Sequence, residues 1–169
     1  GNSNLLHALS MAGGVNDNGS YRQIDLIRNN KVIKSIDLYD IFIHGKSGFG
    51  ERLRSGDSIL VKPSLKMVSI SGAVKRPGLY ELTEDDNFSD LIDFGNGFAD
   101  NANLETLRIE RPVKESTSFV EIPDINKISS FEIRSSDRLN VRAYERRTVT
   151  ISGAVTTPGE YQISNGETL

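Results

Sequence analysis

Cysteine is absent from all 169 residues of the sequence. A disulfide framework, a zinc–thiolate site and a cysteine nucleophile are therefore excluded. Histidine is scarce: His7 and His44 are the only two, and they lack the paired spacing of metal ligands. No serine stands in an arrangement with histidine and aspartate that is typical of nucleophilic catalysis. The sequence therefore predicts no catalytic, metal or cofactor site.

Long hydrophobic runs and an excess of one charge are also missing. No apolar stretch approaches the roughly 18 residues that a membrane-spanning helix needs. The 23 acidic and 20 basic residues are mixed along the chain and leave a net charge of −3 at pH 7. This balance argues against a nucleic-acid partner bound through phosphate contacts.

What the sequence does contain is an internal repeat. Residues 67–82 (MVSISGAVKRPGLYEL) and 148–163 (TVTISGAVTTPGEYQI) are identical at nine of sixteen positions, at an offset of 81 residues. Three further matches pair residues 11–21 with 94–104, 36–41 with 120–125, and 53–57 with 133–137. A repeat of this length is typical of tandem modules.

The matches divide the chain into three parts. Residues 1–66 correspond to the back part of one module, residues 67–147 to a complete module, and residues 148–169 to the first hairpin of a further module. Because the tail carries the hairpin that residues 1–66 lack, we expect these two segments to complete a second module. They would do so within one chain or by swapping between two chains.

The complete module begins with a predicted hairpin. Val68 and Ile70 alternate with polar residues, as in a half-buried strand. Residues 75–78 (KRPG) predict a type II turn in which the glycine takes a positive φ, and residues 79–82 form the return strand. Gly72, inside a strand, indicates a bulge or the close approach of another backbone.

A short helix and three more strands follow in the predicted order. Asn87 is the expected N-cap, and Gly95 and Gly97 are expected to end the helix. The matching helix of the first part covers residues 4–12. Short strands are predicted at residues 107–109, 120–122 and 139–141. One helix over a small mixed sheet, in the order β-β-α-β-β-β, predicts the α+β class and tandem β-grasp (ubiquitin-like) modules.

The repeated motif G-x-V-x-x-P-G-x-Y resembles that of a known family. Its residues are Gly72, Val74, Pro77, Gly78 and Tyr80 in one copy and Gly153, Val155, Pro158, Gly159 and Tyr161 in the other. With the closing pattern R-x-x-D, the chain resembles SLBB (soluble ligand-binding β-grasp) domains. It is similar to the tandem SLBB domains of Wza-type polysaccharide export proteins in particular. We expect the motif residues to be mainly structural.

The resemblance implies a function without catalysis. Proteins of this type form outer-membrane rings that carry capsular polysaccharide or exopolysaccharide from the periplasm to the bacterial surface. A segment of this kind would lie at the periplasmic face of the outer membrane. It would associate with itself, with polysaccharide and with an inner-membrane export partner. The alternative is a β-grasp module that binds a small molecule or carbohydrate and has no role in transport.

Two repeated features allow two interpretations each. Tyr80 and Tyr161 either pack within their hairpins or offer an aromatic face to a carbohydrate. The pairs Arg54 and Asp57, and Arg134 and Asp137, either build a turn or contact a neighbouring module.

Three other patterns suggest chemistry but fit structural roles better. Residues 45–47 (GKS) lack the preceding glycine of a phosphate-binding loop, which favours a surface loop. Residues 16–19 (NDNG) lack the closing glutamate of a calcium loop, which favours a turn. The acidic cluster before and within the second helix favours interaction with the helix N-terminus over glycoside hydrolysis. Its members are Asp85, Asp86, Asp90 and Asp93.

Overall fold

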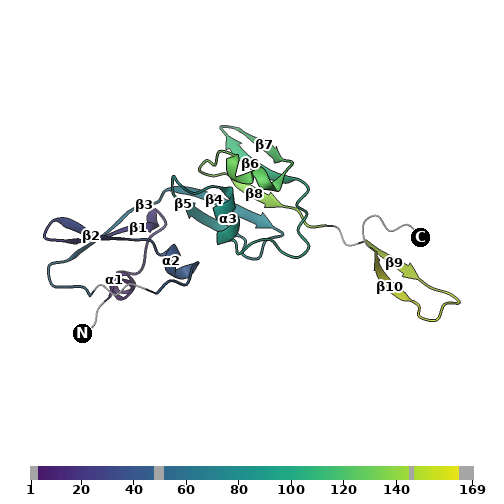
Figure 1. Cartoon of the computed structure of the whole chain (residues 1–169), viewed down its shortest axis with the longest axis horizontal. Helices are drawn as coiled ribbons and strands as arrows, with labels where there is room; N and C mark the ends of the chain where they lie inside the picture. Colours follow the sequence, from purple (N-terminus) through teal and green to yellow (C-terminus); the bar gives the residue numbers. More distant parts are fainter. Residues whose placement is uncertain (1–3, 48–51, 145–146, 164–169) are drawn as a thin grey trace.

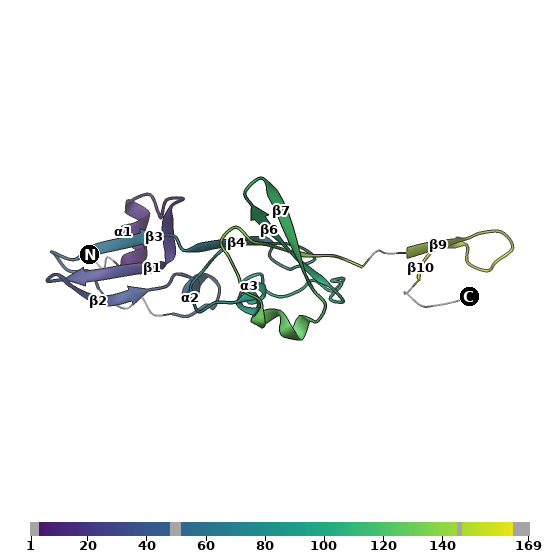
Figure 2. The ribbon, with the colours of Figure 1, turned by 90° about the horizontal axis from the view of Figure 1, so that it is seen from above.

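The computed structural model describes residues 4–47, 52–144 and 147–163. The chain forms three parts in a row along its longest axis (Figure 1), and the view from above keeps the same order (Figure 2). We call them the N-terminal unit (residues 4–63), the central unit (residues 66–144) and the C-terminal hairpin (residues 147–163). The sequence repeat predicts a division into residues 1–66, 67–147 and 148–169, and this division stays a prediction.

The central unit has the predicted β-grasp arrangement. Its elements are β4 (Lys66–Gly72), β5 (Gly78–Leu82), α3 (Phe88–Phe94), β6 (Leu107–Val113), β7 (Ser116–Ile122), the 3₁₀ helix η1 (Ile125–Ser130) and β8 (Arg138–Val141). The strand order is β5-β4-β8-β6-β7. The first and last strands, β4 and β8, lie side by side and run parallel, whereas the other pairs are antiparallel. The predicted α+β class and order of elements are confirmed.

The strands β6 and β7 are longer than predicted. They pair without interruption from Leu107 opposite Ile122 to Val113 opposite Ser116, around Lys114 at a φ of +46°. The predicted strand ends followed the buried residues, but the pairing of β6 with β7 continues through exposed positions. Backbone hydrogen bonds, and not the burial of side chains, hold the half of this hairpin next to Lys114.

The predicted type II turn between β4 and β5 is wrong. Gly78 does not take a positive φ and instead begins β5. The connection is held from outside, since the amide of Lys75 donates to the carbonyl of Gly97 at 3.0 Å and that of Arg76 to Gly95 at 2.8 Å. Hydrogen bonds to the chain after α3 thus take the place of a local turn.

Helix α3 begins where the sequence predicts it. The Asn87 side chain accepts a hydrogen bond from the amide of Ser89, and the Asp90 carboxylate accepts one from the amide of Asn87, each at 2.8 Å. This reciprocal capping satisfies amides that the first turn would otherwise leave unpaired. Phe88 and Leu91 are fully buried on the face that covers the sheet.

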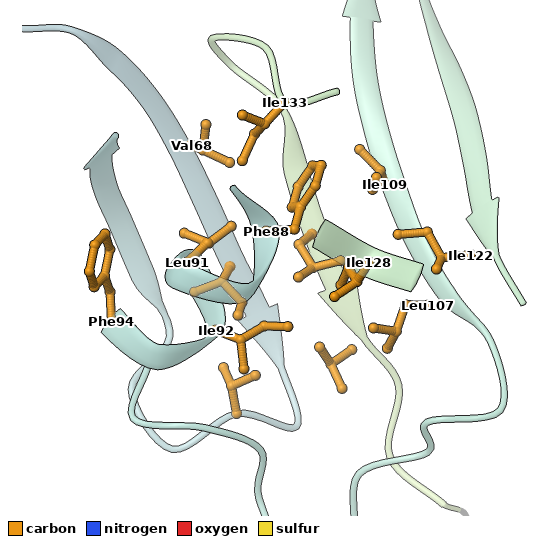
Figure 3. Close-up of a cluster of buried hydrophobic side chains, with 14 of the residues drawn as sticks. Val68, Phe88, Leu91, Ile92, Phe94, Leu107, Ile109, Ile122, Ile128 and Ile133 are labelled. Carbon is orange, nitrogen blue, oxygen red and sulfur yellow. The ribbon is translucent and has the colours of Figure 1, made fainter. Parts of the chain in front are cut away.

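The core of the central unit lies between α3, η1 and the sheet (Figure 3). Phe88, Leu91 and Ile92 of the helix share this cluster with Ile128 of η1 and with Leu107 and Ile109 of β6. Among the described residues this core holds sixteen buried side chains, against six in the N-terminal unit. Since burial of apolar surface is the main source of stability, the central unit is the better-packed part.

The N-terminal unit repeats the second half of this arrangement. Its elements are α1 (Leu5–Met11), β1 (Gly19–Arg28), β2 (Lys31–Ile36), α2 (Tyr39–Phe42) and β3 (Ser58–Pro63). The sheet order β2-β1-β3 matches β7-β6-β8 of the central unit. The C-terminal hairpin, β9 (Arg147–Ile151) and β10 (Gly159–Ile163), repeats β4 and β5 as a separate two-stranded sheet.

A buried arginine–aspartate pair closes the turn before the last strand in both units. Asp137 accepts two hydrogen bonds from the Arg111 guanidinium, at 2.8 and 2.7 Å, and one from the Arg134 amide at 2.9 Å. In the N-terminal unit, Asp57 binds Arg28 and the Arg54 amide in the same way, at 2.7 to 2.8 Å. Of the two interpretations, the pattern R-x-x-D therefore builds a turn inside each unit.

This pairing predicts an acid-sensitive N-terminal unit. The hydrogen bonds from Arg28 and then from the Arg54 amide lower the pKa of Asp57 from 3.8 to about 2. A carboxyl group whose pKa is lowered by folding stabilises the folded state at pH values above its ordinary pKa. This contribution to the free energy of unfolding is lost as the pH falls from about 5 to about 2. We expect Asp57→Asn to be destabilising at pH 7, with a difference from the wild type that shrinks towards pH 2.

Urea midpoints measured between pH 2 and pH 7 check this expectation. Asp17→Asn, which removes one negative charge from an exposed turn of the same unit, is the control and should keep the wild-type pH dependence. A constant difference between Asp57→Asn and the wild type across this range would contradict the assignment.

Candidate functional site

Gly72, the first residue of the repeated motif, lies where two parallel strands come closest. It has a φ of +83°, and a Cβ atom added to it would lie 2.0 Å from the carbonyl oxygen of Val141. That same oxygen accepts a hydrogen bond from the Ala73 amide at 2.8 Å. The backbone of β8 thus occupies the space of a side chain, which only glycine permits at this φ.

The other motif residues fix the loop that follows. Val74 is buried and forms a bridge with Phe98, beyond α3. Pro77 is exposed in the connection, and Gly78 starts the return strand. The mainly structural role expected for the motif as a whole stays a prediction.

The hydroxyl and the ring of Tyr80 both contact other residues of the central unit. The hydroxyl donates to the carbonyl of Arg76 at 2.9 Å, and the half-buried ring lies 6.2 Å from that of Phe94. Tyr161 repeats the first contact by donating to the Thr157 carbonyl at 2.6 Å. Both hydroxyls therefore close their own hairpins, and a carbohydrate contact at either tyrosine stays a prediction.

The second copy of the motif has the same positive φ at its glycine, but no other part of the chain packs on it. Gly153 has a φ of +97°, yet nothing lies within 4 Å of the position of its Cβ. Val155 and Tyr161 are exposed, as are Pro158 and Gly159 of the same connection.

A charged and aromatic cluster joins the N-terminal and central units. The Arg22 guanidinium binds Asp37 of its own unit at 2.9 Å and also Asp86 of the central unit. It lies over the rings of Tyr39 and Phe94, with 4.9 and 5.2 Å from its central carbon to the ring centres. Burial lowers the pKa of Arg22, but the hydrogen bond and charge of Asp37 and the charge of Asp86 outweigh it and raise this pKa.

Glu81 of β5 completes this junction. Its carboxylate accepts hydrogen bonds from the amides of Tyr21, at 2.8 Å, and Leu65, at 3.0 Å. Its own amide donates to the Tyr39 hydroxyl at 2.8 Å. Burial of this hydroxyl raises the pKa of Tyr39 to about 12, so the phenol stays neutral at physiological pH.

A pocket of about 240 Å³ lies beside the junction. Tyr21, Tyr39 and Glu81 line it together with Met67 and Leu79. None of these residues is a fixed position of the repeated motif, and their contacts lie outside the repeat: Gln162, and not glutamate, matches Glu81 in the C-terminal hairpin. No local pattern could have paired Arg22 with Asp86, 64 positions away.

The remaining sequence candidates are held in local contacts. Lys46 of the residues 45–47 pairs with Asp40 at 2.8 Å, and Asp90 caps α3. His7 is exposed on α1, and the His44 ring lies 6.1 Å from that of Phe94. Within residues 4–47, 52–144 and 147–163, no group of three or more histidine or acidic side chains could hold a metal ion. No helix of the same residues is long and apolar enough to cross a membrane.

The Gly72 contact predicts a difference between two glycine substitutions. Gly97 has nearly the same φ, +80°, but open space around its Cβ position. Gly97→Ala should therefore cost about 1 kcal/mol of unfolding free energy, from backbone strain alone. Gly72→Ala should cost about 2 kcal/mol more, because it also pushes β8 away. Equal losses in urea unfolding would show that the close approach of Val141 does not limit this position.

The junction predicts a measurable coupling between Arg22 and Asp86. A double-mutant cycle with Arg22→Ala and Asp86→Ala should give a coupling energy of about 1–3 kcal/mol, because the pair is largely buried. Lys66 and Glu84 form the control pair, since Glu84 is exposed, and should couple by less than about 1 kcal/mol. If the coupling energy of Arg22 and Asp86 were no larger than that of Lys66 and Glu84, the junction would not stabilise the contact between the two units.

Comparison with known proteins agrees with this geometry. Residues 67–120, from β4 into β7, match the SLBB domain family. Over 81 residues the chain is 37% identical to the polysialic acid transport protein KpsD of Escherichia coli, and a second sequence of that name gives the same values. The alignment spans 47% of this chain and 14% of the relative. Residues 67–120 of the central unit are therefore similar to the SLBB domain family, and the chain is similar in part to a polysialic acid transport protein.

Proposed function

We propose that this chain is a periplasmic segment of an outer-membrane polysaccharide export protein. It acts as a structural part of the export conduit, and neighbouring copies form a ring whose lumen passes the polymer. The observation that carries the proposal is the SLBB match over residues 67–120 together with the 37% identity to a polysialic acid transport protein. Polysaccharide and an inner-membrane export protein are the proposed partners.

The geometry of the described units supports an architectural role. Successive units lie in a row along the chain (Figure 1). The largely buried Arg22 cluster ties the N-terminal unit to the central unit through ionic and aromatic contacts. A wall built from such segments would resist bending at this junction, because separating the units breaks the contacts of Arg22 with Asp86 and Phe94.

The motif residues contribute to this role through the backbone. Gly72 lets the hairpin approach the last strand, and Tyr80 closes the connection through its hydroxyl. We propose that Gly153 and Tyr161 do the same in the next module. The motif then recurs because each module needs the same closure.

Fractionation of the source cells tests this proposal, with an antibody raised against the chain. We expect the native protein with the outer membrane, in a large multimer. Recovery as a soluble cytosolic monomer would discard the export proposal. It would leave the alternative, a β-grasp module that binds a small molecule or carbohydrate.

A deletion strain separates export from synthesis. Loss of an export conduit should remove polysaccharide from the cell surface while polymer accumulates inside the envelope. Loss of both the surface polysaccharide and the polymer inside the envelope would point to a role in synthesis. Unchanged polysaccharide at the surface would contradict a transport role. Restoring the wild-type gene is the control, and it should return the polymer to the surface.

A further inference from the structure

The sheet of the central unit has a second face, on the side away from its core (Figure 3). Because side chains alternate along a strand, the residues between the buried ones of β4, β8, β6 and β7 point to this side. We call it the outer face. The strand register arranges its side chains in two rows: Ser71, Asn140, Arg108 and Glu121 in one, and Ser69, Arg138, Glu110 and Phe119 in the other.

One aromatic ring of the outer face is held in place by a guanidinium group. The central carbon of the Arg108 guanidinium lies 3.7 Å from the ring centre of Phe119. The buried Nε atom of Arg108 has no hydrogen-bond partner among the described residues. Arg108 therefore supports one side of the ring. Since Phe119 is 50% exposed, the other side of its ring faces solvent.

The charged groups beside this ring have no partners of their own. Arg138 of β8 lies opposite Glu110 of β6, and Glu110 lies opposite Phe119 of β7. In the part of the chain that the structure describes, the side chains of Arg138, Glu110 and Glu121 form no ion pair and no hydrogen bond. The outer face therefore presents hydrogen-bond donors and acceptors next to an aromatic surface.

A hollow of about 460 Å³ adjoins the ring on the outer face. Glu110 and Arg138 line it together with Pro112 and Thr117. Pockets that bind small ligands have volumes of about 300–1,000 Å³. The unpaired carboxylate of Glu110 and the unpaired guanidinium of Arg138 thus border one space that is large enough for a ligand group.

The N-terminal unit has a different arrangement at the matching positions. Asp25, paired with Leu60 across the strands, stands where Arg108 is paired with Asn140. Asp25 is buried, accepts a hydrogen bond from the Ser35 hydroxyl at 2.7 Å and pairs with Lys62 at 2.8 Å. Its charge is therefore satisfied within the unit. A unit of this fold does not require an unpaired cluster here, so the outer face of the central unit has chemistry of its own.

The mixture of groups on the outer face is complementary to a carbohydrate. Sugar hydroxyls donate and accept hydrogen bonds, and Arg138 and Glu110 supply the matching acceptor and donor. The C–H groups on one side of a pyranose ring pack on the negative face of an aromatic ring, as Phe119 offers. Nucleic acid is less suitable, because the carboxylates of Glu110 and Glu121 repel phosphates.

We infer that the outer face of the central unit binds a sugar residue of a polysaccharide. The sugar ring stacks on the exposed side of Phe119, and its hydroxyls bind Arg138 and Glu110 beside the hollow. Arg108 is a positioning residue that holds the Phe119 ring from behind. The inference rests on the proposed export function, which supplies the polymer.

Surface plasmon resonance tests this site with the purified full chain. The immobilised probe is polysaccharide isolated from the surface of the source cells. We expect saturable binding by the wild type, and Phe119→Ala should raise the dissociation constant by about tenfold because it removes the stacking ring. Phe119→Tyr keeps the ring and should bind nearly as well as the wild type. No binding by the wild type would overturn the inference.

Two matched controls separate the site from general surface effects. Phe42→Ala removes a ring of similar exposure, 57%, from α2 of the N-terminal unit. Arg138→Gln removes an exposed side chain of the outer face and should weaken binding several-fold, whereas Arg76→Gln removes the same charge from the exposed connection between β4 and β5. The two controls should leave the dissociation constant unchanged. Equal effects of each variant and its control would overturn the inference.

The positioning role of Arg108 has its own test. Arg108→Lys keeps the charge but loses the planar group that stacks on the ring. It should weaken binding in the wild-type chain and cause no further loss in a chain that already carries Phe119→Ala. Equal losses in both chains would contradict a role that acts through Phe119.

The binding measurement and the cell experiments can fail separately. If the deletion strain lost its surface polysaccharide but the purified chain did not bind it, export would stand and the site would be overturned. Specific binding together with unchanged surface polysaccharide in that strain would keep the site and discard export. If Phe119→Ala and Arg138→Gln left binding intact but removed the multimer in cells, the outer face would belong to a protein contact and the site would be overturned.

Discussion

The parallel pairing of β4 with β8 is the contact on which the central unit depends. It joins the first and the last strand of the unit, which lie about 70 residues apart in the sequence, and brings α3 and η1 onto one face of a single sheet. Gly72 makes the pairing possible, because the Val141 carbonyl occupies the space of a side chain. The buried core follows from this arrangement, since Ile70 and Leu139 meet at its centre.

In the central unit the hairpin comes first in the chain, and the strand that pairs with it, β8, comes last. The pairing of β4 with β8 therefore forms only when nearly the whole module has come together. The nine identities between residues 67–82 and 148–163 include the glycine at this closest approach, Gly72.

Contacts outside the repeat distinguish one unit from its neighbour. Arg22, Asp86 and Glu81 join the N-terminal unit to the central unit through charges and buried amides. These side chains are directional and need specific partners, whereas the apolar faces of the hairpins accept any surface of matching shape. The repeat therefore provides the modules, and the unrepeated residues fix how two of them meet.

The sequence by itself determined the local features of this protein. Alternation predicted β4, and the capping residues predicted α3 at Asn87, because such patterns act within a few residues. Only the tertiary structure decided how residues 75–78 connect two strands, which arginines bind Asp57 and Asp137, and where Arg22 finds Asp86. These partners lie 19 to 64 positions apart, and no local pattern specifies contacts that form only when sheets and helices pack. Gly72 lies between the two cases: its place in a strand indicated a bulge or a close approach, and the position of β8 decided for the approach.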